Sequence, residues 1–380
     1  MIYLDNAATT FPKPSAVYDK VYEVMRDYGA NPGRSGHDLA LKASRGIFDT
    51  RELLAKFFNV DNPFNIIFTF NATESLNIAI KGVLKPGDHV ITTSMEHNSV
   101  LRPIKFLEKF EVENTIVWAD DKGRVKAEDI EKEIKDNTKL IVTTHISNLT
   151  GTIMPIKEIG NIAKKHGVLY LLDAAQSAGV YGIDLKDNNV DLMAFPGHKG
   201  LLGPQGTGGL YIREGIVLDE LMQGGTGSAS QSLIQPDLMP DKFESGTPNA
   251  PGIIGLGEGI KYINNRGIDN IKMLEERLLT KLIDGIKDIP NITMYGPLNI
   301  NEQAGVLSIN YKGVDSSTIA YVLNEEFGIC VRPGLHCAPL AHETLGTLNQ
   351  GAVRISIGPF NTDNDIEELI LALEKISKEF

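Results

Sequence analysis

Short apolar segments alternate with longer helical segments over the first half of the chain, and this alternation limits the folds that it can adopt. The apolar segments do not alternate polar with apolar residues, so we expect strands that are buried on both faces, as in βαβ units. Between two of them, Ile156, Ile159 and Ile162 recur at helical spacing. These patterns predict an α/β fold with a mostly parallel sheet, built from the strands Asn65–Phe70, His89–Thr93, Asn114–Trp118, Lys139–Thr144, Val168–Leu172, Leu192–Phe195 and Gly209–Ile212.

The pattern changes after Pro251. The stretch from Ile253 to Ile289 has little strand character and carries leucines at helical spacing, so it predicts helix. An α+β segment follows and ends in a helix from about Thr362; its strands are expected near Gly305–Tyr311, Ile329–Arg332 and Ala352–Ile357. We therefore expect two domains: a large α/β domain over residues 15–255, and a smaller α+β domain formed by residues 1–14 and 256–380.

Composition and charge exclude several classes of protein. The chain has 380 residues, of which 42% are hydrophobic, and this is enough apolar material for a large core. Lysine and arginine number 37 and aspartate and glutamate 49, so the net charge is −12, and we expect no nucleic-acid partner because an acidic surface repels phosphate backbones. The apolar runs fall far short of the roughly 20 residues of a membrane span, and the first residues do not resemble a signal peptide. We expect a cytoplasmic protein with no membrane partner.

Three polar positions, each after a predicted strand, are candidates for a ligand site. Asp173 lies at the edge where open α/β sheets bind ligands, although an aspartate there also makes a good helix N-cap. Lys199 lies in a glycine-rich corner, where desolvation would lower its pKa and make the amine nucleophilic, as a Schiff-base lysine requires; a structural role is the alternative. Thr73 lies where a strand enters a helix, and the backbone N–H groups there suit a phosphate, although threonine is also an ordinary cap.

Together these positions match the parts of pyridoxal 5'-phosphate. A lysine suits its aldehyde, a carboxylate suits its pyridine nitrogen, and a helix N-terminus suits its phosphate. The carboxylate would keep the ring nitrogen protonated, so that the ring can accept the electron pair released when a bond to the substrate Cα breaks. We therefore expect pyridoxal 5'-phosphate as the cofactor.

Ordered motifs along nearly the whole chain point the same way. They are Tyr3–Thr10 (YLDNAATT), Asn71–Glu74 (NATE), Met95–Asn98 (MEHN), Ser147–Gly151 (SNLTG), Asp173–Gln176 (DAAQ), Gly197–Lys199 (GHK) and Phe243–Asn249 (FESGTPN). In these motifs the chain resembles the class V aminotransferase family of fold type I pyridoxal-phosphate enzymes, and within it the cysteine desulfurases. The segment Arg332–Cys337 (RPGLHC) resembles that of the Suf-type, or group II, desulfurases and of the related selenocysteine lyases.

The resemblance implies roles for residues around the cofactor. Lys199 would form the Schiff base, Asp173 would pair with the pyridine nitrogen, and His97 would stack on the ring and take part in proton transfer. The remaining cofactor-binding residues would be Ala72, Thr73, Asn148, Gln176, His198 and Thr247.

Among these, Thr73 and His198 would hold the phosphate, and Asn148 and Gln176 would hydrogen-bond the ring oxygen or the substrate carboxylate. Thr247 would reach the phosphate of the neighbouring subunit, which implies a homodimer with active sites at its interface.

Substrate binding is expected to rest on Arg354, Asn148, Arg332 and His37. Arg354 would clamp the substrate carboxylate, because a planar guanidinium forms two parallel hydrogen bonds, and His37 lies in a loop that we expect to line the entrance. The chain departs from the family at Pro196, where relatives usually have a serine that donates to the phosphate. Proline has neither a hydroxyl nor an N–H, so one phosphate contact is lost or replaced.

The two cysteines differ in their surroundings. Cys330 lies in an apolar strand, so we expect it in the core. Cys337 lies in a polar loop, where Arg332 and His336 favour the thiolate; chemistry alone leaves a chance loop cysteine equally open, and the resemblance makes Cys337 the sulfur carrier. Their spacing is not that of a zinc site, so we expect no metal.

The resulting hypothesis is a pyridoxal-phosphate-dependent cysteine desulfurase. It would convert L-cysteine to L-alanine and leave the sulfur on Cys337 as a persulfide, for delivery to a protein acceptor, with Lys199, Cys337 and His97 as catalytic residues. The alternatives are a selenocysteine lyase acting on L-selenocysteine, an aminotransferase or other lyase of the same fold, and a non-catalytic scaffold that binds pyridoxal phosphate.

Overall fold

A seven-stranded sheet forms the centre of the computed structural model, which describes residues 1–33 and 35–379. The strand order is β2-β8-β7-β6-β5-β3-β4; pairing is parallel from β7 to β4, and β8 is antiparallel to both β7 and β2. Every predicted strand is present, so the mostly parallel sheet is confirmed. The observed bounds are β2 (Ile66–Thr69), β3 (His89–Thr93), β4 (Glu113–Val117), β5 (Thr138–Thr144), β6 (Leu169–Asp173), β7 (Leu192–Pro196) and β8 (Gly208–Ile212).

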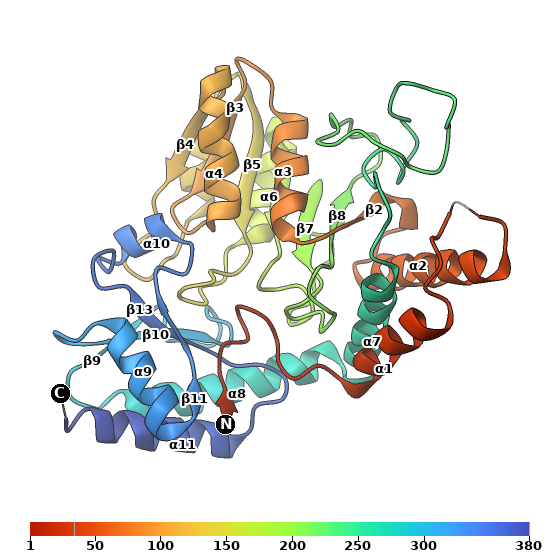
Figure 1. The fold of residues 1–380 in the computed structure, drawn as a ribbon. Coiled ribbons are helices and arrows are strands. Elements are labelled where there is room, and N and C mark those ends of the chain that lie inside the picture. The colour runs from red at the N-terminus through yellow and green to blue at the C-terminus, as the bar shows by residue number, and fades with distance from the viewer. Residues whose placement is uncertain (34, 380) are drawn as a thin grey trace.

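Both faces of this sheet are buried under helices, as the lack of alternation in the strands predicted. On β3, Val90 packs into a cluster with residues of α3 (Ala72–Val83) and α4 (Asn98–Leu107). The next residue, Ile91, packs on the opposite face, in a second cluster. Figure 1 shows α3 and α4 in front of the sheet with α6 behind it. The helices that contribute to the second cluster include α1 (Ser15–Asp27), α2 (Asp38–Phe57), α5 (Ala127–Lys132), α6 (Ile156–His166) and α7 (Ala250–Arg266).

The carboxyl-terminal part has a sheet of its own. Its four strands are antiparallel in the order β12-β13-β10-β9, and β1 (Ile2–Tyr3) pairs in parallel with β11 beside them. A third apolar cluster lies between these strands and the helices that Figure 1 shows below them. The elements are α8 (Ile268–Ile286), β9 (Ile292–Tyr295), β10 (Val306–Tyr311), α9 (Ser316–Phe327), β11 (Ile329–Cys330), β12 (Arg332–Gly334), α10 (Pro339–Thr344), β13 (Ala352–Ser356) and α11 (Asp363–Ile376); short 3-10 helices span Pro63–Asn65 and Glu108–Phe110.

Three details of this part differ from the sequence prediction. The long helical stretch is two helices, because Gly267 between them has φ of 85°, a left-handed conformation that glycine adopts without steric cost. Strand β9 and helix α9 were not predicted. The predicted strand Ile329–Arg332 is divided, since β11 pairs with β1 whereas β12 pairs with β13. Helix α7 runs across residue 255, and the domain boundary placed there stays a prediction.

In the part of the chain that the structure describes, no helix has the length and apolar character needed to cross a membrane.

Candidate active site

A cavity of about 510 Å³ opens at the carboxyl edge of the large sheet, where ligands bind in open α/β folds. The ends of β5, β6 and β7 and the first turns of α3 and α4 surround it. Eight of the predicted site residues line it together: Ala72, Thr73, His97, Asn148, Asp173, Gln176, His198 and Lys199.

Asp173 and Lys199 influence each other electrostatically. Asp173 ends β6 and is 3% exposed; burial raises the pKa of its carboxyl, while the N–H of Ala175, at 2.9 Å from Oδ1, and the charge of Lys199 lower it. Burial and the charge of Arg354 lower the pKa of Lys199 to about 8, against the opposing effect of Asp173. Lys199 therefore has a larger neutral fraction at neutral pH than a surface lysine, as a nucleophilic amine needs.

The first turn of α3 presents donors to the cavity. The side chain of Asn71 caps the helix by accepting from the N–H of Glu74 at 3.0 Å. The N–H groups of Ala72 and Thr73 make no hydrogen bond to the residues that the structure describes. The Thr73 hydroxyl lies 2.8 Å from that of Ser99, in the first turn of α4. Two helix N-termini thus converge here, an arrangement that favours an anion.

His97 is fixed as a neutral acceptor at one nitrogen. It is the N-cap of α4, and its Nδ1 accepts from the N–H of Ser99 at 3.0 Å. Burial, Lys199 and nearby arginines lower its pKa to about 4, so the ring is neutral at physiological pH. The proton then resides on Nε2, which leaves a donor available on the other edge of the ring.

His198 is held by the amino-terminal segment of the chain. Its Nδ1 lies 3.0 Å from the Thr9 hydroxyl, and its backbone carbonyl accepts from the Lys13 ammonium at 2.5 Å. Burial, Lys199 and Lys13 lower the pKa of His198 to about 4, and burial lowers the pKa of Lys13 to about 7. Pro196, the residue in the serine position of the family, ends β7 and also lines the cavity.

Arg354 lies beside this cavity on β13 and is only 1% exposed. Its Nη2 bonds to the Asp5 carboxylate at 2.8 Å and its Nη1 to the Asn148 carbonyl at 3.1 Å, while its buried Nε has no partner among the described residues. Arg332 stands opposite Arg354 in the register of β12 with β13, so the two side chains share one face of the sheet. Burial lowers the pKa of Arg354, and the Asp5 carboxylate counteracts this effect.

Cys337 is exposed on a turn that is bound to the cavity wall. Its carbonyl accepts from the N–H of Asn98 at 2.7 Å, next to His97 in the chain, and the carbonyl of His336 accepts from Asn148 Nδ2 at 2.8 Å. The thiol is therefore carried by backbone that contacts two segments of the cavity. Cys330, in contrast, is only partly buried, so its placement in the core was wrong: β11 is a two-residue strand, and the Cys330 sulfur lies 3.8 Å from Asn324 Oδ1.

Besides Arg354, Arg332 and Cys337, two more predicted residues lie outside the lining of this cavity, His37 and Thr247. His37 is an exposed N-cap of α2, with Nδ1 accepting from the N–H of Ala40 at 3.3 Å. Thr247 is exposed and lines a different hollow, together with Phe70 and Met222. Their roles, and those of the other predicted site residues, stay predictions. Gln176 lines the cavity but donates its amide to the Ala7 carbonyl at 3.1 Å.

Sequence reasoning assigned no role to Asp5 or Lys13, although both lie in or beside the YLDNAATT motif. The structure brings Asp5 to Arg354 and Lys13 to His198. Their motif was a signal, but only the fold shows which partner each residue meets.

Comparisons with known proteins point to one family. The family model of aminotransferase class-V matches residues 2–369. The chain is 40% identical to a probable cysteine desulfurase of Methanothermobacter thermautotrophicus, covering 99% of this chain and 94% of that protein, and 32% identical to a cysteine desulfurase of Haloferax volcanii, covering 98% and 89%. The apo structure of a cysteine desulfurase from Thermococcus onnurineus superposes with a TM-score of 0.93 at 34% identity, covering 100% of this chain and 95% of that one.

The family model spans nearly the whole chain, and five of the seven ordered motifs contribute residues to one cavity. The chain belongs to the class-V aminotransferase family.

Proposed function

We propose that this protein is a pyridoxal-phosphate-dependent cysteine desulfurase. Relatives that match it over nearly their full length are named cysteine desulfurases or probable cysteine desulfurases. The observation that carries the proposal is the position of Cys337: an exposed thiol on a turn whose backbone is bonded to Asn98 and Asn148. Asn148 lines the same cavity as Lys199, the lysine with a lowered pKa.

The residues of the cavity fit the proposed cofactor. The two unpaired N–H groups at the start of α3, with the Thr73 hydroxyl, suit the phosphate. One oxygen of the buried Asp173 carboxyl is not used by the Ala175 N–H and suits a protonated ring nitrogen. Lys199 suits the aldehyde. When bound, pyridoxal phosphate supplies an aldehyde for an amino group and a ring that accepts an electron pair.

The protein's own residues then bind the substrate and move its protons. The Arg354 guanidinium keeps an Nε–H without a partner among the described residues, and its planar group suits the two oxygens of the cysteine carboxylate. Lys199, with a pKa of about 8, holds a proton at Nζ or releases it near neutral pH, so it serves as base and acid at the substrate Cα. His97 offers the Nε2–H from the side of α4.

Cys337 takes the sulfur. Its thiolate attacks the substrate sulfur, so that an S–S bond forms as the Cβ–S bond breaks, and the electron pair of the broken bond stays with the substrate carbon. Both sulfurs are oxidised by one electron each and the carbon is reduced by two. The proton lost from the Cys337 thiol is balanced by the one gained at Cβ, and the products are L-alanine and a persulfide on Cys337.

The test is mass spectrometry of the holoprotein after incubation with L-cysteine. We expect one added sulfur on the Cys337 peptide and an equivalent amount of L-alanine. The variant Cys337→Ser should retain the absorbance of the bound cofactor and form neither product, whereas Cys330→Ser should behave as the parent. If Cys337→Ser releases alanine at the parental rate, the mechanism is refuted; if the parent instead requires a keto acid, the protein is an aminotransferase.

A homodimer with a protein sulfur acceptor, acting in the reducing cytoplasm, completes the proposal. Three apolar side chains of α1 are exposed, Tyr18 at 49%, Tyr22 at 63% and Met25 at 67%, and a second copy of the chain would cover such a face. Thr247, outside the Lys199 cavity, is available to a neighbouring subunit. Sedimentation equilibrium tests the dimer, and loss of the persulfide to an added carrier protein tests the transfer.

A further inference from the structure

Two buried histidines stack behind the turn that carries Cys337. The rings of His336 and His342 are 5.6 Å apart and nearly parallel, at 11°, and their side chains are 2% and 0% exposed. His336 directly precedes the cysteine, and His342 lies on α10. His336 Nδ1 lies 3.3 Å from His342 Nε2. The sequence led us to expect that His336 favours the Cys337 thiolate, and it assigned no role to His342.

The partners of the pair determine which nitrogens carry protons. His336 Nε2 lies 2.9 Å from the Arg332 carbonyl, which only accepts, so Nε2 bears a hydrogen. In the neutral ring Nδ1 is then an acceptor, and it must receive the Nε2–H of His342. His342 Nδ1 in turn accepts from the Thr347 hydroxyl at 2.8 Å. The result is one directed chain of hydrogen bonds from Thr347 through both rings to Arg332.

This chain stays neutral at working pH. The pKa of His336 is lowered to about 3, mainly by burial and next by the charge of Arg354, with smaller effects of His342 and Arg332. Burial lowers the pKa of His342 to about 4. The Arg332 carbonyl partly opposes the shift in His336. A proton on His336 would place a cation in a closed site near Arg354 and Arg332, and a proton on His342 would place one in a fully buried site.

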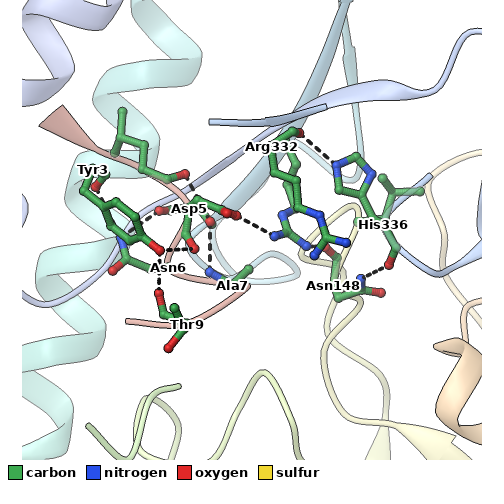
Figure 2. A network of polar contacts seen from close by, with 12 residues as sticks. Tyr3, Asp5, Asn6, Ala7, Thr9, Asn148, Arg332 and His336 are labelled. Atoms are coloured by element: carbon green, nitrogen blue, oxygen red, sulfur yellow. Dashed lines mark hydrogen bonds and ion pairs between the residues drawn. The ribbon is translucent and has the colours of Figure 1, made fainter. Parts of the chain in front are cut away.

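The turn that these rings support has an unfavourable backbone conformation. His336 has φ of 51° and Cys337 has φ of 56°, so two successive residues with side chains lie in the left-handed region. Asn148 and Asn98 bond the carbonyls of His336 and Cys337 in this turn (Figure 2 shows the Asn148 contact). The His336 ring bonds the carbonyl of Arg332, in the strand β12 that leads into the turn. Helix α10 is itself tied to the large sheet, because the Thr344 hydroxyl bonds Ser94 Oγ at 2.9 Å.

We propose that His342 is a positioning residue for the sulfur-transfer step: its Nε2–H holds the His336 ring, and the His336 ring holds the Cys337 turn in its reactive conformation. The kcat test of this role rests on the proposed desulfurase function, whereas the alkylation test below does not. His342 lies on α10, and Thr344 of the same helix bonds Ser94 directly after β3. The two histidines therefore connect the turn that carries Cys337 to the end of β3.

The experiment compares His342→Leu with His342→Gln in a Cys330→Ser background, which leaves Cys337 as the single thiol. Leucine removes the donor, whereas the glutamine amide can still donate to His336. In the holoprotein we expect His342→Leu to lower kcat for persulfide formation about tenfold or more, the scale of leaving one buried acceptor unpaired. The KM for L-cysteine and the cofactor absorbance should change less than twofold, and glutamine should restore most of kcat.

A second readout does not need the catalytic activity. The rate of Cys337 alkylation as a function of pH reports its exposure and thiol pKa, and we expect His342→Leu to shift this profile while His342→Gln does not. Leu369→Ala, in the core of α11, controls for lost stability. If His342→Leu does not fold, Thr347→Val takes its place as a smaller change. It should move kcat and the alkylation profile in the direction expected for His342→Leu.

The outcomes separate the two proposals. An unchanged kcat and alkylation profile in folded His342→Leu, or in folded Thr347→Val where leucine does not fold, would overturn the positioning role. An equal loss in folded His342→Gln would overturn it as well, because the donor would then not matter. If the parent forms no persulfide, the proposed function fails, and the alkylation profiles alone decide the positioning role.

Discussion

Glu96, directly before His97, is expected to make the protein less stable as the pH rises. The side chain is 0% exposed; its Oε1 accepts from the Thr93 hydroxyl at 2.6 Å and the Thr144 N–H at 3.0 Å, and its Oε2 has no partner in the described chain. Burial raises its pKa from 4.5 to about 8. The folded protein therefore keeps a proton on Glu96 that the unfolded chain releases above pH 4.5.

The sign and size of the change in unfolding free energy with pH follow from this proton. The stabilisation is full below pH 4.5 and is lost as the pH rises toward 8, at about 1.4 kcal/mol per pH unit. The loss is about 3 kcal/mol at pH 7 and about 5 kcal/mol above pH 8. Glutamine at this position has no proton to lose and keeps the acceptor for Thr93 and Thr144. Glu96→Gln should thus be slightly less stable than the parent near pH 5, by about 1 kcal/mol for an extra unpaired N–H, and clearly more stable at pH 8.

Urea unfolding of the full-length protein at several pH values between 5 and 9 measures this crossing. Glu275→Gln is the matched comparison, because Glu275 is a second buried acid, 5% exposed, whose pKa burial also raises to about 8. Each variant should remove part of the parental pH dependence, and the double variant should remove both parts. A Glu96→Gln profile that runs parallel to the parent between pH 5 and 8 would refute the reasoning.

Two further predictions concern charges at the cavity. Arg354→Gln should raise the KM for L-cysteine about 10- to 100-fold, because a charge-assisted hydrogen bond to a carboxylate contributes about 1.5–3 kcal/mol. Steady-state kinetics measures this change, with Arg354→Lys as the control. An unchanged KM would contradict the binding of the substrate carboxylate by Arg354. Asp173→Asn should lower the pKa of Lys199, since the Asp173 charge raises it. The pH dependence of Lys199 acetylation in the cofactor-free protein should then move to lower pH, and no movement would show that the two groups do not interact.

Local patterns predicted the large sheet well, because its strands are short, apolar and bounded by turns. The segment His89–Thr93 follows Gly87 and Asp88 and is itself buried throughout, so pattern and structure coincide. Lys199, Asp173 and Thr73 were found for a related reason: strands of one parallel sheet end at one edge, so residues after them meet.

What the sequence could not provide are contacts between distant segments. Asp5 and Arg354 meet across nearly the whole chain, and no periodicity carries that information. The histidine pair depends on a positive φ at His336, which a local pattern does not reveal for a residue other than glycine. Cys330 looked like a core residue from its apolar neighbours, but its strand is an edge of only two residues.

The pairing of the first strand has a consequence for how the chain is made. Ile2 and Tyr3 pair in register with Ile329 and Cys330, and Asp5 reaches Arg354, so these residues must wait for partners that are synthesised far later in the chain. At roughly 5–20 residues per second this delay lasts some tens of seconds. During it the large sheet can form, while Ile2 and Leu4 remain exposed to chaperones or other nascent chains. Synthesis of β11 and β13, rather than emergence of the large sheet, is then the event that completes these pairings and positions Arg354.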